Sequence, residues 1–301
     1  MVVSIQELSC LDHLLWLRTG VHAAQRLNLS QASVSRTASR VAEAFHLQLV
    51  KPDGEWALCG DPRLLNLERA VHQLFRWDRQ LPLRLEAQYY SGPLLFDGDD
   101  PAIRRAYALG NFDFLEVHTP LQLLRDGVLD GWIGCYPDVP DGDPAFACFH
   151  LTRLPTWLVV SDGHPLLQFG RELSFADLEP FPSLALPEGA FPRCEAHLRE
   201  KGLWNTAVRA QRYDTSKWEG RTSDAITIGY ASALSVHLFA HPQRVLPLDV
   251  GLDVGDTLVV RSSFADHPRC RTLLAELQGR ARTLASRYPD VRLMFGEPVA
   301  S

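Results

Sequence analysis

The stretch LNLSQASVSRTASRVAEAF, residues 27–45, constrains the fold more than any other part of the chain. Ser30 stands where a helix N-cap belongs, because its hydroxyl can accept a hydrogen bond from a backbone N–H of the first turn. A helix that begins there gathers apolar side chains on one face: Val34, Ala38, Val41, Ala42 and Phe45. Small polar and basic side chains share another face at helical spacing: Ser33, Arg36, Thr37 and Arg40. The pattern predicts a helix that packs on a small domain with one face and exposes small polar and basic side chains on another.

The segments on either side predict a helix-turn-helix with a wing. Leucines at helical spacing indicate a first helix that Gly20 ends, and residues 22–28 indicate a short second helix. Residues 47–58, LQLVKPDGEWAL, alternate apolar side chains on both sides of PDG, which is typical of a β-hairpin. Two helices joined by a tight turn, the second with a polar face, are the plan of a DNA reader whose second helix enters the major groove.

The polar face offers the chemistry that DNA recognition needs. Gln31 can pair bidentately with an adenine edge, and Arg36 can pair with guanine or a phosphate. Ser33 and Ser35 can reach base edges or backbone oxygens. A solvated face on a small helical domain is the alternative, and the residues alone leave both interpretations open.

Charge is unevenly distributed along the chain. The net charge of the whole protein is −6, whereas residues 1–80 hold nine basic and eight acidic residues, a net charge of +1. Between Arg18 and Lys51 the sequence has a single acidic residue, Glu43. The first part of the chain is therefore suited to face a polyanion, although the whole chain is not.

A long helix is predicted from Pro62 to about residue 80. Its apolar residues fall at heptad a and d spacing: Leu64, Leu67, Val71 and Leu74. Fewer than three heptads make a weak coiled coil, so an ordinary packed helix is the alternative to a helix that pairs two copies of the chain.

From Pro82 onward, strands and helices alternate, which predicts an α/β fold with a parallel or mixed sheet. Strands are expected at residues 83–90, 112–118, 131–136, 156–160, 181–187, 207–214, 227–240 and 256–263. Helices are expected at residues 102–109, 121–126, 193–201, 217–225 and 267–287.

Composition and missing motifs exclude several function classes. With 46% hydrophobic and 22% charged residues, the chain can bury a globular core, and it has neither a signal peptide nor an apolar run long enough to span a membrane. Six scattered cysteines without metal-ligand spacing indicate reduced thiols in a cytoplasmic protein. Nucleotide, metal and hydrolase signatures are absent, so we expect neither cofactor nor enzymatic activity, and a dispersed Ser/His/Asp site is the remaining enzymatic alternative.

The segment AAQRLNLSQASVSR, residues 23–36, resembles the winged helix-turn-helix of LysR-type transcriptional regulators. The resemblance implies DNA contacts on this helix and from the wing: Gln31, Ala32, Ser33, Ser35, Arg36, Arg40 and Lys51. The second half departs from the family, with Val41-Ala42, His46 and residues 49–52, LVKP, in place of Leu-Glu, a glycine and Leu-Phe-x-Arg. The family's wing arginine is thus absent, and its role would pass to Lys51.

Four further patches resemble the family's effector-binding half, a two-lobed module of periplasmic-binding-protein type: residues 123–134, 154–166, 173–186 and 228–236. The resemblance implies a winged helix-turn-helix at residues 1–60, a linker and dimerisation helix at 61–81, and an effector-binding domain at 82–301. Lobe I would comprise residues 82–155 and 260–301, and lobe II residues 156–259.

Ligands of such a fold bind in the cleft between lobes, where strands end and helices begin. The resemblance places these residues there: Tyr90, Ser91, Thr119, Tyr136, Glu188, Ala190, Phe191, Asp214 and Thr215. A structural turn role is the alternative for each. Helix N-termini favour a carboxylate, common in this family, whereas Glu188 and Asp214 would repel one or attract an amine, and the sequence does not decide between them.

These expectations combine into a cytoplasmic LysR-type regulator. It would bind inverted half-sites in double-stranded promoter DNA as a homodimer or homotetramer, with a small-molecule effector, and would not associate with a membrane. A two-lobed binding protein without a DNA-binding role is the main alternative.

Overall fold

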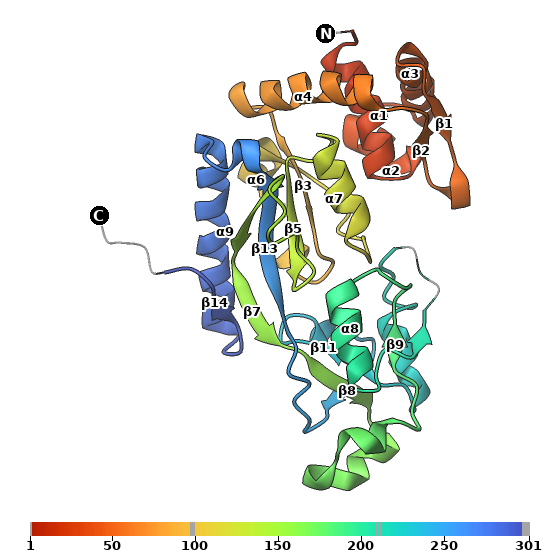
Figure 1. Ribbon diagram of the computed structural model, residues 1–301, viewed down its shortest axis with the longest axis vertical. Helices are drawn as coiled ribbons and strands as arrows, with labels where there is room; N and C mark the ends of the chain where they lie inside the picture. Colours follow the sequence, from red (N-terminus) through yellow and green to blue (C-terminus); the bar gives the residue numbers. More distant parts are fainter. Residues whose placement is uncertain (1, 97–99, 209, 211, 297–301) are drawn as a thin grey trace. The chain divides into compact units, whose positions relative to one another are not determined.

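The computed structural model describes residues 2–96, 100–208, 210 and 212–296, and the chain divides into two compact units. The first unit comprises residues 1–85, 99–111 and 122–131, and the second comprises residues 86–98, 112–121 and 132–301. Both units are drawn in Figure 1 with the labels used below.

The first unit contains these elements: α1 (Ile5–Trp16), α2 (Gly20–Leu27), α3 (Gln31–Ala44), β1 (Gln48–Val50), β2 (Ala57–Cys59), α4 (Arg63–Asp78), the start of β3 (Leu83–Ala87), α6 (Pro101–Ala106), β4 (Tyr107–Leu109) and the end of α7 (His118–Arg125). Helices α1, α2 and α3 cluster beside the β1–β2 hairpin (Figure 1). Their shared core confirms the predicted apolar stripe of α3, since Val34, Ala38, Val41, Ala42 and Phe45 are all buried.

Ser30 caps α3 as predicted, because its side chain accepts a hydrogen bond of 3.1 Å from the backbone N–H of Ser33. The hairpin is also confirmed, with β1 antiparallel to β2 and Val50 opposite Ala57. The prediction that Gly20 ends the first helix is wrong. Helix α1 ends at Trp16, and Thr19 caps a new helix that starts at Gly20.

Helix α4 confirms the predicted helix and has two different faces. The heptad residues are about half exposed or more: Leu64, Leu67, Val71 and Leu74. The opposite face buries long polar side chains, which include Arg69, His72, Gln73 and Arg76. The apolar side of α4 thus faces away from the core of its own unit.

The second unit contains the end of β3 and the start of α7 together with these elements: α5 (Gly92–Leu95), β5 (Gly131–Tyr136), β6 (Phe146–His150), β7 (Thr152–Pro155), β8 (Trp157–Ser161), β9 (Leu184–Ala185), α8 (Pro192–Glu200), β10 (Thr206–Ala207), β11 (Gly229–Ala231), β12 (Gln243–Val245), β13 (Asp253–Arg261), α9 (Pro268–Arg287) and β14 (Arg292–Leu293). Strand β13 is a central strand of one sheet and pairs antiparallel with β5, β6 and β7. Strand β8 is the centre of a second sheet, antiparallel to β11 and β12. The predicted α/β class is confirmed.

Helix α9 has the amphipathic pattern of a helix that packs against a core. Its buried residues recur every three or four positions: Cys270, Leu273, Leu277, Ala281 and Leu284. One face of the helix is therefore apolar and buried, while the other is solvated.

Several expected elements differ from the structure. The expected strand at 112–118 makes only a single bridge, between Phe114 and Arg212, because its amides bond elsewhere: the N–H of Phe112 donates to the Glu86 carboxylate. The expected helix at 102–109 is shorter, since Tyr107–Leu109 forms β4, parallel to β3.

The later elements are also shorter than expected. Residues 217–225 form a short 3-10 helix, Glu219–Asp224, and the strand within 227–240 covers only Gly229–Ala231. Of the expected strand at 207–214, Thr206–Ala207 pairs with Leu184–Ala185, and residues 209 and 211 lie outside the described part. No helix in the described residues is long and apolar enough to cross a membrane.

Candidate DNA-binding and ligand-binding sites

The predicted DNA-contacting residues of α3 form one accessible face. Gln31, Ala32 and Arg36 are exposed, while Ser33 and Ser35 are partly exposed. Within this face, Ser30 Oγ donates to Ser33 Oγ at 2.9 Å. Ser33 Oγ also accepts a long contact of 3.5 Å from Arg36 Nη2. The first two turns of α3 therefore present amide, hydroxyl and guanidinium groups together.

Arg40 has a protein partner that the sequence did not reveal. Its Nη2 atom lies 2.9 Å from Glu7 Oε1 on α1, in an ion pair at the protein surface. Glu7 is itself tied to the start of α1, where it accepts a hydrogen bond from the Ser4 backbone N–H. Arg40 must leave or share this carboxylate to contact a phosphate, unlike Arg36.

The wing is fastened to the helices by an ion pair. Arg18, at the end of the first helical segment, lies 3.1 Å from Glu55 in the hairpin. Lys51 is exposed and its ammonium lies 5.4 Å from the centre of the Trp56 ring. The hairpin and the helices thus belong to one domain. The ammonium group of Lys51 remains exposed to solvent on this domain.

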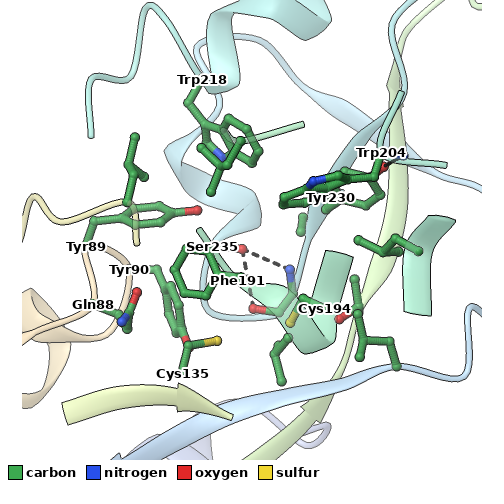
Figure 2. A pocket seen from close by; sticks show the side chains of 18 residues that line it. Gln88, Tyr89, Tyr90, Cys135, Phe191, Cys194, Trp204, Trp218, Tyr230 and Ser235 are labelled. Carbon is green, nitrogen blue, oxygen red and sulfur yellow. Dashed lines mark hydrogen bonds between the residues drawn. The ribbon is translucent and has the colours of Figure 1, made fainter. Parts of the chain in front are cut away.

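A pocket of about 110 Å³ lies within the second unit, and aromatic rings make up much of its wall. Figure 2 shows these rings grouped around a common space: Tyr89, Tyr90, Phe191, Trp204, Trp218 and Tyr230. We call this space the aromatic pocket. The segment after β3, the turn before α8 and strand β11 all contribute to it. The first of these lies in the part of the sequence that was assigned to lobe I, and the other two lie in the part that was assigned to lobe II.

The rings hold one another in place. Trp204 packs against Tyr230 with ring centres 5.7 Å apart and edge-on against Trp218 at 6.4 Å. Trp204 has a positive φ of 62° after a turn, and its backbone N–H donates to the Tyr230 hydroxyl at 2.9 Å. On the other side, Tyr89 stacks on Tyr213 at 3.9 Å. Such offset and edge-on pairs are the preferred aromatic arrangements, so the wall is fixed before a ligand enters.

Three polar groups in the wall lack a hydrogen-bond partner: Gln88 Nε2, Thr156 Oγ1 and Trp204 Nε1. Their side chains belong to residues that are 2%, 7% and 4% exposed. An unsatisfied buried donor costs about 1–3 kcal/mol. By contrast, Ser235 Oγ accepts from the Ser232 backbone N–H at 2.9 Å, as the dashed lines in Figure 2 indicate.

The ionisable groups of the wall are neutral near pH 7. Burial raises the pKa of Tyr89 and Tyr90 well above the ordinary value for tyrosine. Burial likewise raises the pKa of Cys135 to about 12, and that of Cys194 well above its usual value. The described lining contains no lysine, arginine, histidine, aspartate or glutamate.

Two helix N-termini in the second unit, those of α7 and α8, already hold carboxylates of the chain itself. Asp138 is buried and accepts from the backbone N–H groups of Arg193 at 2.6 Å and Cys194 at 3.0 Å, at the start of α8. Glu116 accepts from the Thr119 N–H at 2.9 Å, at the start of α7. These carboxylates occupy the N–H groups that would otherwise bind an external anion.

The structure brings some predicted effector residues to the aromatic pocket. Tyr90 and Phe191 line it, and Ser91 and Ala190 are buried directly beside them in sequence. The other predicted residues do not line it: Thr119, Tyr136, Glu188, Asp214 and Thr215. Tyr136 lies instead against Arg153, whose guanidinium is 3.5 Å from the ring centre.

Sequence reasoning missed most of the wall, including Gln88, Trp204, Trp218 and Tyr230. These side chains meet through contacts between segments far apart in the chain, and no local spacing links them. The one available signal was the number of aromatic residues in segments that break the regular strand and helix pattern.

Comparisons with known proteins agree with this architecture. The family model described as "LysR substrate binding domain" matches residues 102–282. A curated relative, the HTH-type transcriptional regulator GbpR of Azospirillum brasilense, is 34% identical over 110 residues. That match covers 35% of this chain and only 30% of the relative's length.

Solved structures resemble the chain over nearly its whole length. A cysteine-to-aspartate variant of full-length OxyR from Pseudomonas aeruginosa has a TM-score of 0.57 at 18% identity, covering 98% of this chain and 99% of that one. An arginine-to-histidine variant of full-length BenM has a TM-score of 0.52 at 17% identity, covering 97% and 99%. At these identities the likeness establishes the fold.

Proposed function

Because the chain belongs to the LysR substrate-binding domain family, we propose that it is a LysR-type transcription regulator that reads double-stranded DNA with α3. In this proposal residues 1–60 bind DNA, residues 61–81 link and pair subunits, and residues 82–301 bind an effector. The protein acts in the cytoplasm, with no enzymatic step and no cofactor.

The observation that carries the proposal is the accessible face at the start of α3. Gln31 and Arg36 are exposed on a helix whose other face is buried in a three-helix core. Amide and guanidinium groups at the N-terminal end of a second helix are the groups that read base edges and phosphates in the major groove.

The exposed apolar face of α4 supports a homodimer or homotetramer. Leu64, Leu67, Val71 and Leu74 stand on one side of the helix and are about half exposed or more in their own chain. Pairing two such helices would bury the apolar face and relate two reading helices by a two-fold axis. The operator would then have inverted half-sites about one helical turn apart, or a multiple of that spacing.

Regulation follows if the ligand binds two arrangements of the subunits with different affinity. An effector in the aromatic pocket would then shift the population between two DNA-bound arrangements by that difference. Of the predicted effector residues, Tyr90 and Phe191 line the pocket, and Ser91 and Ala190 are their neighbours in sequence.

The test is a DNA-binding assay with purified full-length protein and fragments selected from genomic DNA. Arg36→Ala and Gln31→Ala should each weaken binding to the selected site by about 1–3 kcal/mol if they read bases. Arg171→Ala removes an exposed arginine in the second unit and serves as the charge-matched control. Affinity should also fall steeply with salt. If no fragment is retained, or if all three variants bind equally well, the DNA-reading role of α3 is excluded.

A further inference from the structure

We propose that the aromatic pocket takes an uncharged ligand, a single ring that carries a hydrogen-bond-accepting oxygen such as a carbonyl. This inference rests on the proposed function in treating the pocket as the effector site. It narrows the ligand class beyond the carboxylate and amine alternatives that the sequence left open.

The pocket volume sets the size of the ligand. At about 110 Å³, it is close to the roughly 150 Å³ of an engineered apolar cavity that holds benzene. One six-membered ring fills such a space. Six aromatic side chains in the wall offer ring faces and edges for the ring to stack against (Figure 2).

An anionic ligand lacks a partner in this pocket. The described lining has no basic side chain, and burying an unpaired carboxylate is strongly unfavourable. Helix N-termini could replace a basic side chain, but Asp138 already accepts from the first N–H groups of α8. Glu116 does the same at α7. A second carboxylate near either helix start would meet a like charge.

A cationic ligand lacks a counter-ion as well. Aromatic faces attract cations, yet two residues of the lining, Gln88 and Trp204, carry N–H groups without a partner, and these donors offer nothing to a cation. Glu219 follows Trp218 in sequence and is buried, and burial raises its pKa to about 8. Its carboxyl group is therefore mostly protonated at pH 7 before a ligand binds, and Glu219 is not among the described lining residues, so an amine would have to displace that proton without direct contact in the lining.

The unsatisfied donors specify the complementary group. An amide N–H₂ and an indole N–H can only donate, so both require an acceptor. Thr156 Oγ1 can donate to the same acceptor or accept from a hydroxyl. A carbonyl oxygen has two lone pairs and can accept from two of these groups, which relieves the cost of leaving them unpaired.

The test uses four probes that keep one ring and nearly one shape: acetophenone, benzoate, benzamidinium and cumene. Acetophenone offers a neutral carbonyl, benzoate adds a negative charge, benzamidinium adds a positive charge, and cumene has no acceptor. Dissociation constants come from calorimetry, with thermal shifts of the same protein as a second readout. We expect acetophenone to bind at least tenfold more tightly than benzoate or benzamidinium, and about fivefold more tightly than cumene.

A matched pair of variants tests whether the indole N–H of Trp204 donates a hydrogen bond to the ligand. Trp204→Phe removes the indole N–H from the pocket and keeps an aromatic ring, whereas Trp132→Phe removes an equally buried, unpartnered indole N–H on β5 outside the lining. Trp204→Phe should remove most of the roughly fivefold preference for acetophenone over cumene, and Trp132→Phe should leave that preference unchanged. Equal effects of the two variants would contradict the assignment.

The outcomes separate this inference from the proposed function. Tighter binding of benzoate or benzamidinium than of acetophenone overturns the ligand class, as does the failure of acetophenone to bind at its solubility limit. In both cases, retained binding to genomic DNA leaves the regulator proposal intact. If acetophenone binds as expected but no DNA is retained, the ligand class stands and the DNA-reading role fails.

Discussion

Replacing Asp12 with asparagine should destabilise the first unit strongly. Asp12 lies on α1 and is fully buried, with Oδ1 2.9 Å from Arg69 Nε on α4 and Oδ2 2.7 Å from Arg84 Nη1 on β3. Arg84 also donates to Ser9 Oγ at 3.0 Å. One carboxylate therefore joins α1 to α4 and to β3 within the first unit.

The magnitude follows from burial on both sides of the pair. The Asp12, Arg69 and Arg84 side chains are 0%, 2% and 5% exposed. Removing one partner of such a buried pair costs about 3–5 kcal/mol, because the remaining charges stay buried without compensation. Against a total stability of about 5–15 kcal/mol, Asp12→Asn should lower the midpoint of thermal unfolding by on the order of 10 °C.

The pH dependence of the same group provides a second signature. Burial alone raises the pKa of Asp12, but Arg69 and Arg84 outweigh it, so the pKa lies below its ordinary value. The unfolded state then binds the proton more readily than the folded state. The contribution of Asp12 is therefore complete above about pH 4 and disappears as the pH falls through the lowered folded pKa.

The assay is urea unfolding followed by tryptophan fluorescence, at pH 7 and at lower pH. Glu7→Gln provides the control, since it breaks the surface pair with Arg40 and should cost about 1 kcal/mol or less. A loss of under about 1 kcal/mol for Asp12→Asn, similar to that of Glu7→Gln, would refute the claim that the buried pairs hold α1, α4 and β3 together.

Three further changes test other parts of the structure. Leu67→Asp, on the exposed face of α4, should dissociate the oligomer in sedimentation experiments, whereas Phe169→Asp, on an exposed side chain of the second unit, should not. Burial, and after it Arg84, lowers the pKa of His13 to about 3, so stability should fall by about 1.4 kcal/mol per pH unit below pH 6.5. His13→Gln should flatten that decline in urea midpoints between about pH 6.5 and pH 5, and an unchanged slope contradicts the assignment. Asp138→Asn should cost about 1–2 kcal/mol by weakening the cap of α8, measured by thermal unfolding, and a neutral effect would show that this helix start does not need the charge.

Helix α3 was predictable because its determinants are local. Ser30 caps the N–H of a residue three positions later, and the buried stripe of α3 repeats within the helix itself. Such signals survive in any tertiary context that buries one side of the helix. The partner of Arg40 was not predictable, because Glu7 is 33 positions away and on another helix.

The expected strand at 112–118 shows how tertiary hydrogen bonds override local propensity. Its apolar residues are buried, since Phe114, Leu115 and Val117 are 2–4% exposed, although Phe114 and Leu115 are consecutive and do not alternate as in a strand with one buried face. The backbone, however, bonds to Glu86, to the Ala190 carbonyl oxygen and, at the single bridge, to the Tyr213 N–H, and it forms no continuous ladder. The apolar residues of the segment are thus buried, but its backbone hydrogen bonds are not those of a strand.

Ligand chemistry was the hardest property to read from the sequence, for the same reason. A helix N-terminus attracts an anion only when its N–H groups are free, and whether they are free depends on carboxylates that arrive from elsewhere in the chain. Asp138 reaches the start of α8 from 55 residues away, and no local pattern announces it. Once that carboxylate is in place, the charge preference of the family's fold no longer determines the ligand. The unpaired donors of Gln88 and Trp204 in an uncharged aromatic wall determine it instead.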